Sequence, residues 1–534
     1  MRILPFLPAL ALGFSLPAHS ADISVGAAGT CSAHTIAEAV ALAAATPEAD
    51  TIRLANDQAY LGQTAFIDTA VDLIGGHAAC GDTVPTGRTA LVGTGEWATL
   101  SIWGGEGIDS FPVRIERLDI SGGGASGDIG TWGGLNIAGR VRVHVADTEV
   151  HHNHNSHGGG LTVSFNAIVT LERNVEIHDN LASVGGGILV AGATLRMQPS
   201  AVVVRDNQAI DGGGIAVLSG ALASSGSDPK DPLTPVDGVL VHANQASNRG
   251  GGLYVGGAES KALLDDVVLR DNSAAEGGGA FAGDGGYAQF ARFRHGPFRH
   301  CASELECLRL SGNIAERGGA VSVRNGGSAH LSEAIVRDNA AAGGSAIWMH
   351  GEGSSVRLYS SLVVGNGCIE GAPGCAPIFT MGGSLRFEHS TFADNDGGPA
   401  LIFGDGEQGA FLTDILGRSS LVSGKERIFD FFGALPTVRY DCILKDQGTF
   451  EVAAERSEIL PIAFQAPARG DYRLLPGNAA IDFCDDAPVS AKSPDIDGNL
   501  RGIDDLASQD RFGTYDLGAY ESDRIFASGS ESKR

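Results

Sequence analysis

The sequence predicts an all-β fold: a solenoid of parallel coils with a helical cap at the N-terminal end and a β cap at the C-terminal end. One phrase, VRDNQAIDGGGIAV from Val204, recurs through the middle of the chain. The asparagines of its copies are spaced by 27, 27, 37, 28, 41, 26, 27 and 29 residues. A period near 27 that is broken by two insertions is typical of stacked coils. Many of the 77 glycines lie in these copies, which indicates tight corners in every coil.

Each copy of the phrase predicts three short strands. Within one repeat they are expected at residues 187–190, 193–197 and 202–205. Each strand should pair with its counterpart one coil away, about 4.8 Å along the axis. Alternate side chains then fill a narrow core of Val, Ile, Leu and Ala, because aromatic residues make up only 6% of the chain. Beyond residue 88 the period gives roughly 12 to 14 coils.

An asparagine marks one corner of each coil. Because asparagine tolerates the left-handed backbone conformation better than most residues, we expect each corner asparagine to adopt it. Stacked asparagine amides can also bond to one another as a ladder. The structural corner residues are Asn153, Asn180, Asn207, Asn244, Asn272, Asn313, Asn339, Asn366 and Asn395.

The N-terminal region predicts export followed by a cap. Residues 1–20 hold one arginine, an apolar run and small residues before position 21, which predicts a signal peptide. A membrane anchor is disfavoured because a span needs roughly 20 apolar residues. Residues 21–87 are expected to form the cap and the first strands, with an amphipathic helix at 35–45. The cap covers backbone and core that the first coil would otherwise expose.

Two insertions interrupt the period, at residues 218–237 and 284–307. Both are expected to leave the coil after the glycine-led strand and to rise from the same edge. The second concentrates basic and aromatic residues in an otherwise acidic chain. Such insertions often carry the binding face of a repeat protein, so its residues are candidate ligand-binding groups. They are Tyr287, Arg292, Phe293, Arg294, His295, Arg299 and His300.

The two ends and the repeats each resemble a known family. Cys31-Ser32 followed by IAEA from Ile36 resembles the CSLREA-type motif of exported bacterial β-helix proteins. Near the C-terminus, PGNAAID from Pro476 and DLGAYE from Asp516 resemble the choice-of-anchor Q domain over about 50 residues. The coils resemble the right-handed parallel β-helix of the pectin-lyase-like superfamily, and the handedness rests on that resemblance.

Composition, the repeat period and these resemblances together divide the chain into five parts. Residues 1–20 are the signal peptide, 21–87 the N-terminal cap and first strands, and 88–410 the parallel β-helix with its two insertions. Residues 411–521 are expected to hold the last coil or coils and the choice-of-anchor Q-like domain. Residues 522–534 form a polar tail.

Eight cysteines predict disulfides. An even number in an exported chain favours pairing, although eight cysteines allow 105 connectivities. Proximity favours Cys301–Cys307 and Cys368–Cys375, which leaves Cys31–Cys80 and Cys442–Cys484 at the two ends.

The net charge of −26 excludes some partners. Such a surface repels nucleic acid and anionic lipid, so no nucleic-acid partner is predicted. No stretch after residue 20 is apolar enough to cross a bilayer, so no membrane span is predicted. The sequence does not define an oligomeric state.

One acidic segment near the C-terminus is a candidate calcium site. Asp495, Asp497 and Asn499 imitate the first half of a calcium loop, and Asp504 follows closely. It is not an EF-hand, because Leu500 stands where that loop needs glycine. Turn-forming carboxylates are the alternative interpretation.

The function predicted from these observations is a non-catalytic one. We expect an exported protein, extracellular, on the outer surface or in the periplasm, with an adhesin-like or glycan-contacting role. The alternative is a secreted polysaccharide lyase or glycoside hydrolase that uses the face of the 284–307 insertion. A purely structural envelope component is the third possibility. No motif specifies catalysis, and Asp265 and Asp266 cannot act as a pair because adjacent strand residues face opposite ways.

Overall fold

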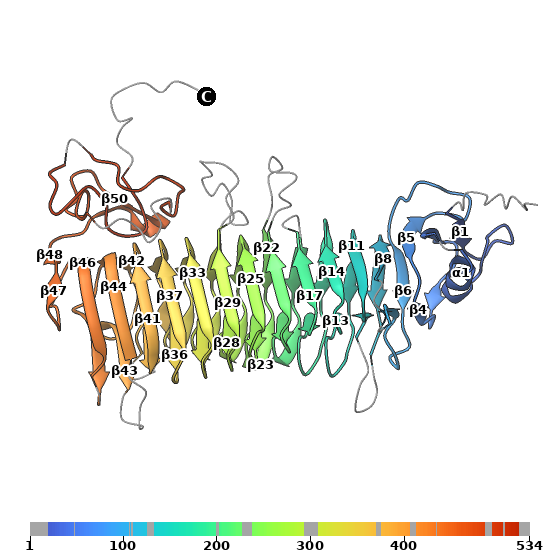
Figure 1. Cartoon of the computed structure of the whole chain (residues 1–534), viewed down its shortest axis with the longest axis horizontal. Coiled ribbons are helices and arrows are strands. Elements are labelled where there is room, and N and C mark those ends of the chain that lie inside the picture. The colour runs from blue at the N-terminus through green and yellow to red at the C-terminus, as the bar shows by residue number, and fades with distance from the viewer. Residues whose placement is uncertain are drawn as a thin grey trace, which may run out of the picture.

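The chain folds into a rod of stacked parallel strands, with a helix at one end and an irregular unit on one edge near the other end (Figure 1). This computed structural model describes residues 20–522 except 47, 106, 108–109, 125–132, 199–201, 227–237, 293–307, 370–374, 406–412, 434, 486–493 and 506–507. The prediction of an all-β parallel solenoid is confirmed.

The glycine-led strands form one parallel sheet of 13 strands within the described residues. Each coil contributes one strand, and 12 of these strands lie beyond residue 88, within the range of 12 to 14 coils predicted for that part of the chain. In order along the rod these strands are β4 (Ala65–Ile67), β7 (Leu100–Trp103), β10 (Leu135–Ala138), β13 (Leu161–Ser164), β16 (Ile188–Ala191), β20 (Ile215–Leu218), β24 (Leu253–Gly256), β28 (Ala280–Gly283), β32 (Val321–Arg324), β36 (Ile347–His350), β40 (Ile378–Met381), β43 (Ala400–Asp405) and β45 (Arg427–Phe432).

The next strand of each coil belongs to a second parallel stack, which we call the first ladder. Its strands are β1 (Asp22–Val25), β2 (Asp50–Ala55), β5 (Val71–His77), β8 (Phe111–Glu116), β11 (Val141–Ala146), β14 (Ile168–Leu171), β17 (Thr194–Met197), β21 (Leu222–Ser225), β25 (Lys261–Asp265), β29 (Tyr287–Ala291), β33 (Ser328–Ser332), β37 (Ser355–Tyr359), β41 (Gly383–Glu388), β44 (Thr413–Val422), β46 (Thr437–Lys445) and β47 (Ala454–Glu455).

A bend separates the first ladder from the second ladder, and the long strands β44 and β46 run through both. The other strands of the second ladder are β3 (Tyr60–Leu61), β6 (Thr89–Val92), β9 (Leu118–Ser121), β12 (Glu149–His151), β15 (Val175–His178), β18 (Val202–Arg205), β22 (Val239–His242), β26 (Val267–Arg270), β30 (Arg309–Ser311), β34 (Ile335–Arg337), β38 (Leu362–Val364), β42 (Thr391–Ala393) and β48 (Glu458–Ile459).

A short fourth strand follows the asparagine in the middle coils. These strands form a sheet of six: β19 (Gln208–Asp211), β23 (Gln245–Arg249), β27 (Ser273–Glu276), β31 (Ile314–Arg317), β35 (Ala340–Gly343) and β39 (Gly367–Cys368).

The core is filled by stacks of like residues. Ile188 lies in register with Ile215, and Val190 with Val217, and all four are at most 1% exposed. Parallel in-register pairing repeats this arrangement from coil to coil, so every coil buries its apolar side chains against those of its neighbours.

The corner asparagines form one continuous ladder. The Nδ2 of each donates to the Oδ1 of the next over 2.9–3.1 Å, in eight consecutive bonds from Asn153 to Asn395. Each Oδ1 also accepts the backbone N–H of the preceding asparagine over 3.0–3.1 Å. All nine residues are buried. The ladder therefore satisfies polar groups along the inside of this corner.

The expectation that these asparagines are left-handed is wrong. The positive φ belongs to the residue just before, as at Asp179 (53°), Asp206 (55°) and Asp338 (55°). The chain turns one residue early, which lets the asparagine side chain point inward to the next coil while the aspartate stays outside. The first glycine of the triplet makes the next turn, with φ of 68° at Gly212.

The N-terminal cap contains the predicted helix, α1 (Ile36–Ala43). Thr35 caps its first turn, and Glu38 returns the interaction to complete a capping box. The buried residues Ile36, Ala39, Val40 and Ala43 lie on one face of the helix, as an amphipathic pattern requires.

The C-terminal unit is largely irregular. It contains β49 (Phe464–Ala466), the 3₁₀-helix η1 (Pro467–Arg469) and β50 (Asp471–Leu474). Its apolar residues, including Ile481 and Phe483, share a core with Leu421 and Leu444 of the last long strands. This shared core fixes the unit to the rod.

Three disulfides join described residues: Cys31–Cys80, Cys368–Cys375 and Cys442–Cys484. The first links the N-terminal cap to the first coils, and the last links β46 to the C-terminal unit. Cys301 and Cys307 lie outside the described residues.

Both insertions begin later than the sequence predicts. Residues 222–225 form β21 and residues 287–291 form β29, and both strands continue the first ladder. The insertions therefore leave the coil at the bend between the two ladders and not after the glycine-led strand. The polar composition of 218–237 and the charged residues near 290 concealed these strands.

Candidate binding groove

Outward-facing residues of the first ladder line a groove of about 460 Å³ on strands β29, β33, β37 and β41. In-register pairing places these strands side by side, and alternate residues face out. The polar lining residues include Gln289, His330, Arg357, Tyr359, Arg386 and Glu388.

Two arginines of the groove are stacked on neighbouring coils. Arg357 of β37 is the register partner of Arg386 of β41, at a strand spacing of about 4.8 Å. Neither forms an ion pair with an acid among the described residues, and Arg386 Nε is buried without a hydrogen-bond partner there. Two adjacent cations that form no ion pair with a described acid attract an anionic ligand, and guanidinium groups bind carboxylates in a bidentate manner.

A tyrosine and a histidine lie beside the arginines. The Tyr287 hydroxyl is 2.9 Å from His330 Nδ1 and 3.0 Å from Gln289 Oε1, so it donates its one proton to one of them. Burial and the charge of Arg357 lower the pKa of His330. Burial raises the pKa of Tyr287. At neutral pH the imidazole is therefore uncharged and the tyrosine keeps its proton.

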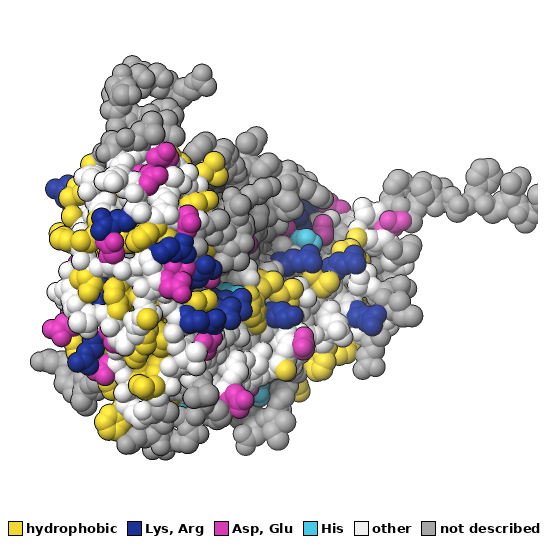
Figure 2. All heavy atoms as spheres, turned by 60° about the vertical axis from the view of Figure 1, so that its left-hand side comes forward, with side chains coloured by type: hydrophobic (Ala, Val, Ile, Leu, Met, Phe, Trp, Pro, Cys, Tyr) yellow, Lys and Arg dark blue, Asp and Glu magenta, His cyan; other side chains and the backbone are white. Residues whose placement is uncertain are grey.

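The C-terminal unit borders the groove along the bend between the ladders. Ser360 Oγ, one residue beyond Tyr359, donates to the carbonyl oxygen of Pro494 over 3.2 Å and receives a bond from Arg501 Nη2 over 3.0 Å. Arg292 Nη1, just past β29, donates to the carbonyl oxygen of Ile496. Figure 1 shows the unit on this edge of the rod, and Figure 2 shows Lys and Arg side chains in a band across the adjoining face.

The structure describes two of the seven predicted ligand-binding residues. Tyr287 lies at the groove through its contact with His330, and Arg292 contacts the C-terminal unit. The remaining five lie outside the described residues: Phe293, Arg294, His295, Arg299 and His300.

The four predicted calcium ligands do not form one group. The carboxylate of Asp495 is buried and accepts backbone N–H groups of Asn499 (2.6 Å) and Glu521 (2.9 Å). Asp497 pairs with Arg473 at 2.7 Å. Asp504 lies elsewhere, where its carboxylate is within 4.8 Å of those of Asp482 and Asp510. Asp495 and Asn499 form a turn, because backbone donors satisfy the carboxylate.

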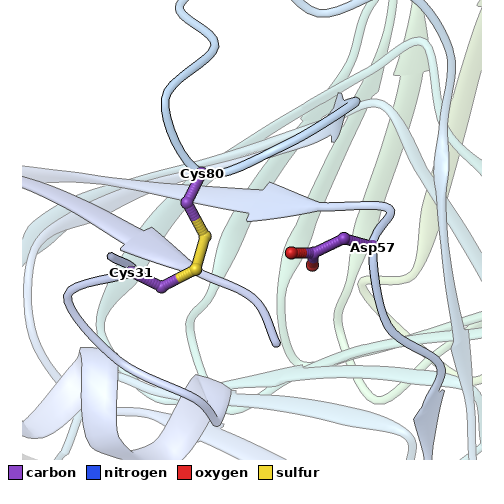
Figure 3. A group of neighbouring side chains, drawn as sticks. All are labelled: Cys31, Asp57 and Cys80. Carbon is purple, nitrogen blue, oxygen red and sulfur yellow. A yellow bond between two sulfur atoms is a disulfide. The ribbon is translucent and has the colours of Figure 1, made fainter. Parts of the chain in front are cut away.

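A sulfur-containing cluster near the N-terminus is also structural. The carboxylate of Asp57 lies close to Cys31 and Cys80, whose sulfur atoms are bonded to each other (Figure 3). A disulfide offers no thiolate to a metal ion. Asp57 instead accepts the backbone N–H of Ala27 over 3.1 Å.

Sequence reasoning missed the residues of the groove, although the repeat contains their signal. His330, Arg357 and Arg386 each stand nine residues before a corner asparagine, as in 366 − 357 = 9. Equal offsets predict stacking at one position of successive coils. The insertion at 284–307 carries the denser group of basic and aromatic residues, whereas the groove residues are separated by 27 and 29 positions in the sequence.

Within the described residues no helix combines the length and apolar composition that crossing a membrane requires. The three disulfides are typical of proteins that fold in an oxidising compartment. Comparisons with family models, with curated proteins and with solved structures find no match for this chain.

Proposed function

We propose that this protein is an exported, glycan-contacting rod that binds an acidic polysaccharide in the groove of the first ladder. The observation that carries the proposal is the stacked pair Arg357 and Arg386, which has no acidic partner among the described residues. In a chain of net charge −26, such a pair gives the groove a local positive potential.

Carboxylated sugars suit this groove better than neutral ones. Two guanidinium groups one coil apart can each bind a carboxylate of the same polymer strand. Tyr287, Tyr359 and Gln289 add hydroxyl and amide groups that can bond to sugar hydroxyls. The groove crosses several coils, so a polymer running along the rod axis would contact all of them.

Export is supported by three features of the chain. The composition of residues 1–20 suits a signal peptide, and the disulfides suit an oxidising compartment. The C-terminal unit resembles the choice-of-anchor Q domain, whose members are exported. In this proposal the protein has an adhesin-like role at a cell surface, in which the groove binds its polymer without turnover.

The proposal is tested by calorimetry with a panel of acidic and neutral polysaccharides. We expect binding to at least one uronate polymer and none to neutral polymers of similar length. The double variant Arg357→Ala/Arg386→Ala should lose at least tenfold in affinity. The control Arg196→Ala removes an exposed arginine of the same ladder outside the groove, and it should bind normally. Equal losses in both variants, or equal binding of neutral polymers, would contradict the proposal.

Elimination chemistry is a second candidate, favoured by the Tyr287–His330 contact. In a uronate held by Arg357, the uncharged imidazole would take the proton from C5. The C4–O4 bond would break as the C4=C5 double bond forms, and the Tyr287 hydroxyl would give its proton to the leaving oxygen. The arginine would neutralise the carboxylate while charge develops at C5.

Product formation separates the two candidates. The same polymers are incubated with the protein, and unsaturated-uronate absorbance and new reducing ends are followed. Turnover that disappears in His330→Gln and Tyr287→Phe would identify a lyase. New reducing ends without unsaturated product would identify a hydrolase. Binding without either product would leave the non-catalytic role.

A further inference from the structure

A second cluster of ionisable residues lies on the second ladder, in the N-terminal half of the rod. Strands β12 and β15 each present Glu-x-His on their outer face, and Glu149 pairs in register with Glu176 as His151 does with His178. The rings of His151 and His178 are stacked, with centroids 5.1 Å apart. One ligand atom each from Glu149, Glu176 and His178 lies within 4.8 Å of the others.

Both ring nitrogens of His178 face carboxylate oxygens. Its Nε2 is 2.7 Å from Glu149 Oε1 and its Nδ1 is 2.7 Å from Asp179 Oδ2. The imidazolium donates to both carboxylates, whereas the neutral ring donates to one and leaves a nitrogen lone pair facing the other. The side chain is only 8% exposed, so water does not easily relieve that contact.

When the ring is neutral, a metal cation between Nε2 and Glu149 satisfies the nitrogen lone pair that faces the carboxylate. Asp179 then accepts from Nδ1–H, which is the usual way a carboxylate fixes the tautomer of a metal-binding histidine. Glu176 supplies the third ligand, and Arg205 Nε holds its Oε1 at 2.5 Å while Arg88 Nη1 holds Glu149 Oε2 at 2.6 Å. The two arginines orient the carboxylates and leave the other oxygen of each for the ion.

We propose that His178, Glu149 and Glu176 form a zinc-binding site that links two adjacent coils. One imidazole and two carboxylates are ligands that zinc accepts, with a fourth position for water. No cysteine lies between residues 81 and 300, so the ion would supply a cross-link in a part of the rod without disulfides.

Calorimetric titration of the chelator-treated full chain with zinc chloride tests the site at about pH 7.5. We expect one ion per chain and a higher melting temperature in excess zinc. The variants His178→Gln and Glu176→Gln should each weaken binding at least tenfold. Circular dichroism will show whether each variant folds. If His178→Gln does not fold, Glu176→Gln still tests the site, because the Glu176 side chain is 32% exposed and its replacement should leave the fold intact.

The control variant is His154→Gln, which removes an exposed histidine nearby and should bind zinc normally. Absence of binding at about 100 μM zinc, roughly a hundredfold above the dissociation constant of a micromolar site, would overturn the proposal. Unchanged affinity in both His178→Gln and Glu176→Gln would overturn it as well. Loss of binding in His154→Gln would assign the ion to exposed histidines instead.

Discussion

Asn207 Nδ2 donates to Asn244 Oδ1 over 3.0 Å, although 37 residues separate them in the chain. The first insertion leaves and returns between these two residues, and the asparagine ladder passes it without a gap. The insertion therefore changes the length of the coil but not the stacking of its corner. The same holds at the second insertion, where Asn272 donates to Asn313 over 3.1 Å.

Replacing Asn244 should destabilise the rod strongly. Its Oδ1 accepts from both Asn207 Nδ2 and the Asn207 backbone, so Asn244→Ala leaves two buried donors without an acceptor. We expect a loss of about 3 kcal/mol in the free energy of unfolding. Urea denaturation measures it. The control Asn248→Ala removes a surface bond to Asp211, and it should cost less than about 0.5 kcal/mol.

Replacing Gly212 tests the turn before the glycine-led strand. Its φ of 68° disfavours any L side chain, and a Cβ there would lie 2.8 Å from the Cβ of Ala216. Gly212→Ala should therefore lower the free energy of unfolding by about 2 kcal/mol. Gly81→Ala is the matched control, because its Cβ would meet no atom within 4 Å. Equal stability of the two variants would refute the argument.

The C-terminal unit should be more stable in mild acid than at alkaline pH. Burial raises the pKa of Asp516 to about 7 and that of Asp482 to about 6. Each of these carboxyls has a higher pKa in the folded protein than in the unfolded chain, where it is about 3.9. Such a group stabilises the fold at pH values below about 3.9, and this stabilisation is lost as the pH rises through the folded pKa. We therefore expect stability to fall between about pH 4 and 7.

Differential scanning calorimetry across this range measures the effect. Asp516→Asn should remove much of the pH dependence, whereas Glu352→Gln, at an exposed site, should leave it unchanged. A melting temperature of the unit that rises from pH 5 to pH 8 would show that its carboxylates are stabilised as anions, against the expectation.

Salt should weaken polysaccharide binding through the two arginines. Exposed charges are screened over about 8 Å at physiological ionic strength, so the affinity of the native groove should fall as salt is added. The Arg357→Ala/Arg386→Ala variant should show both lower affinity and a flatter salt dependence. An unchanged slope would mean that other basic groups hold the polymer. Calorimetry at three salt concentrations decides between these outcomes.

The repeat made the rod predictable and also encodes the stacking of Arg357 on Arg386, while the border of the groove depends on contacts that no period encodes. The interval of about 27 residues places Ile188 on Ile215 and one asparagine on the next, because parallel coils pair equivalent positions. The border of the groove comes from Ser360 and Pro494, which are 134 residues apart and lie in parts of the chain that share no pattern. The positive φ of Asp206 was not predicted because aspartate and asparagine both suit corner positions. Only the inward hydrogen bonds of Asn207 distinguish which of the two residues makes the turn.

The disulfide between Cys442 and Cys484 has a mechanical consequence. Tension applied between the C-terminal unit and the N-terminal cap would pass through this covalent link into β46 and then along the rod. The inter-strand hydrogen bonds point along the rod axis, so such a force pulls them apart in turn instead of shearing them together. Each released coil of 27 residues would add about 90 Å of extended chain, so a stretched rod would lengthen in regular steps and dissipate load one coil at a time.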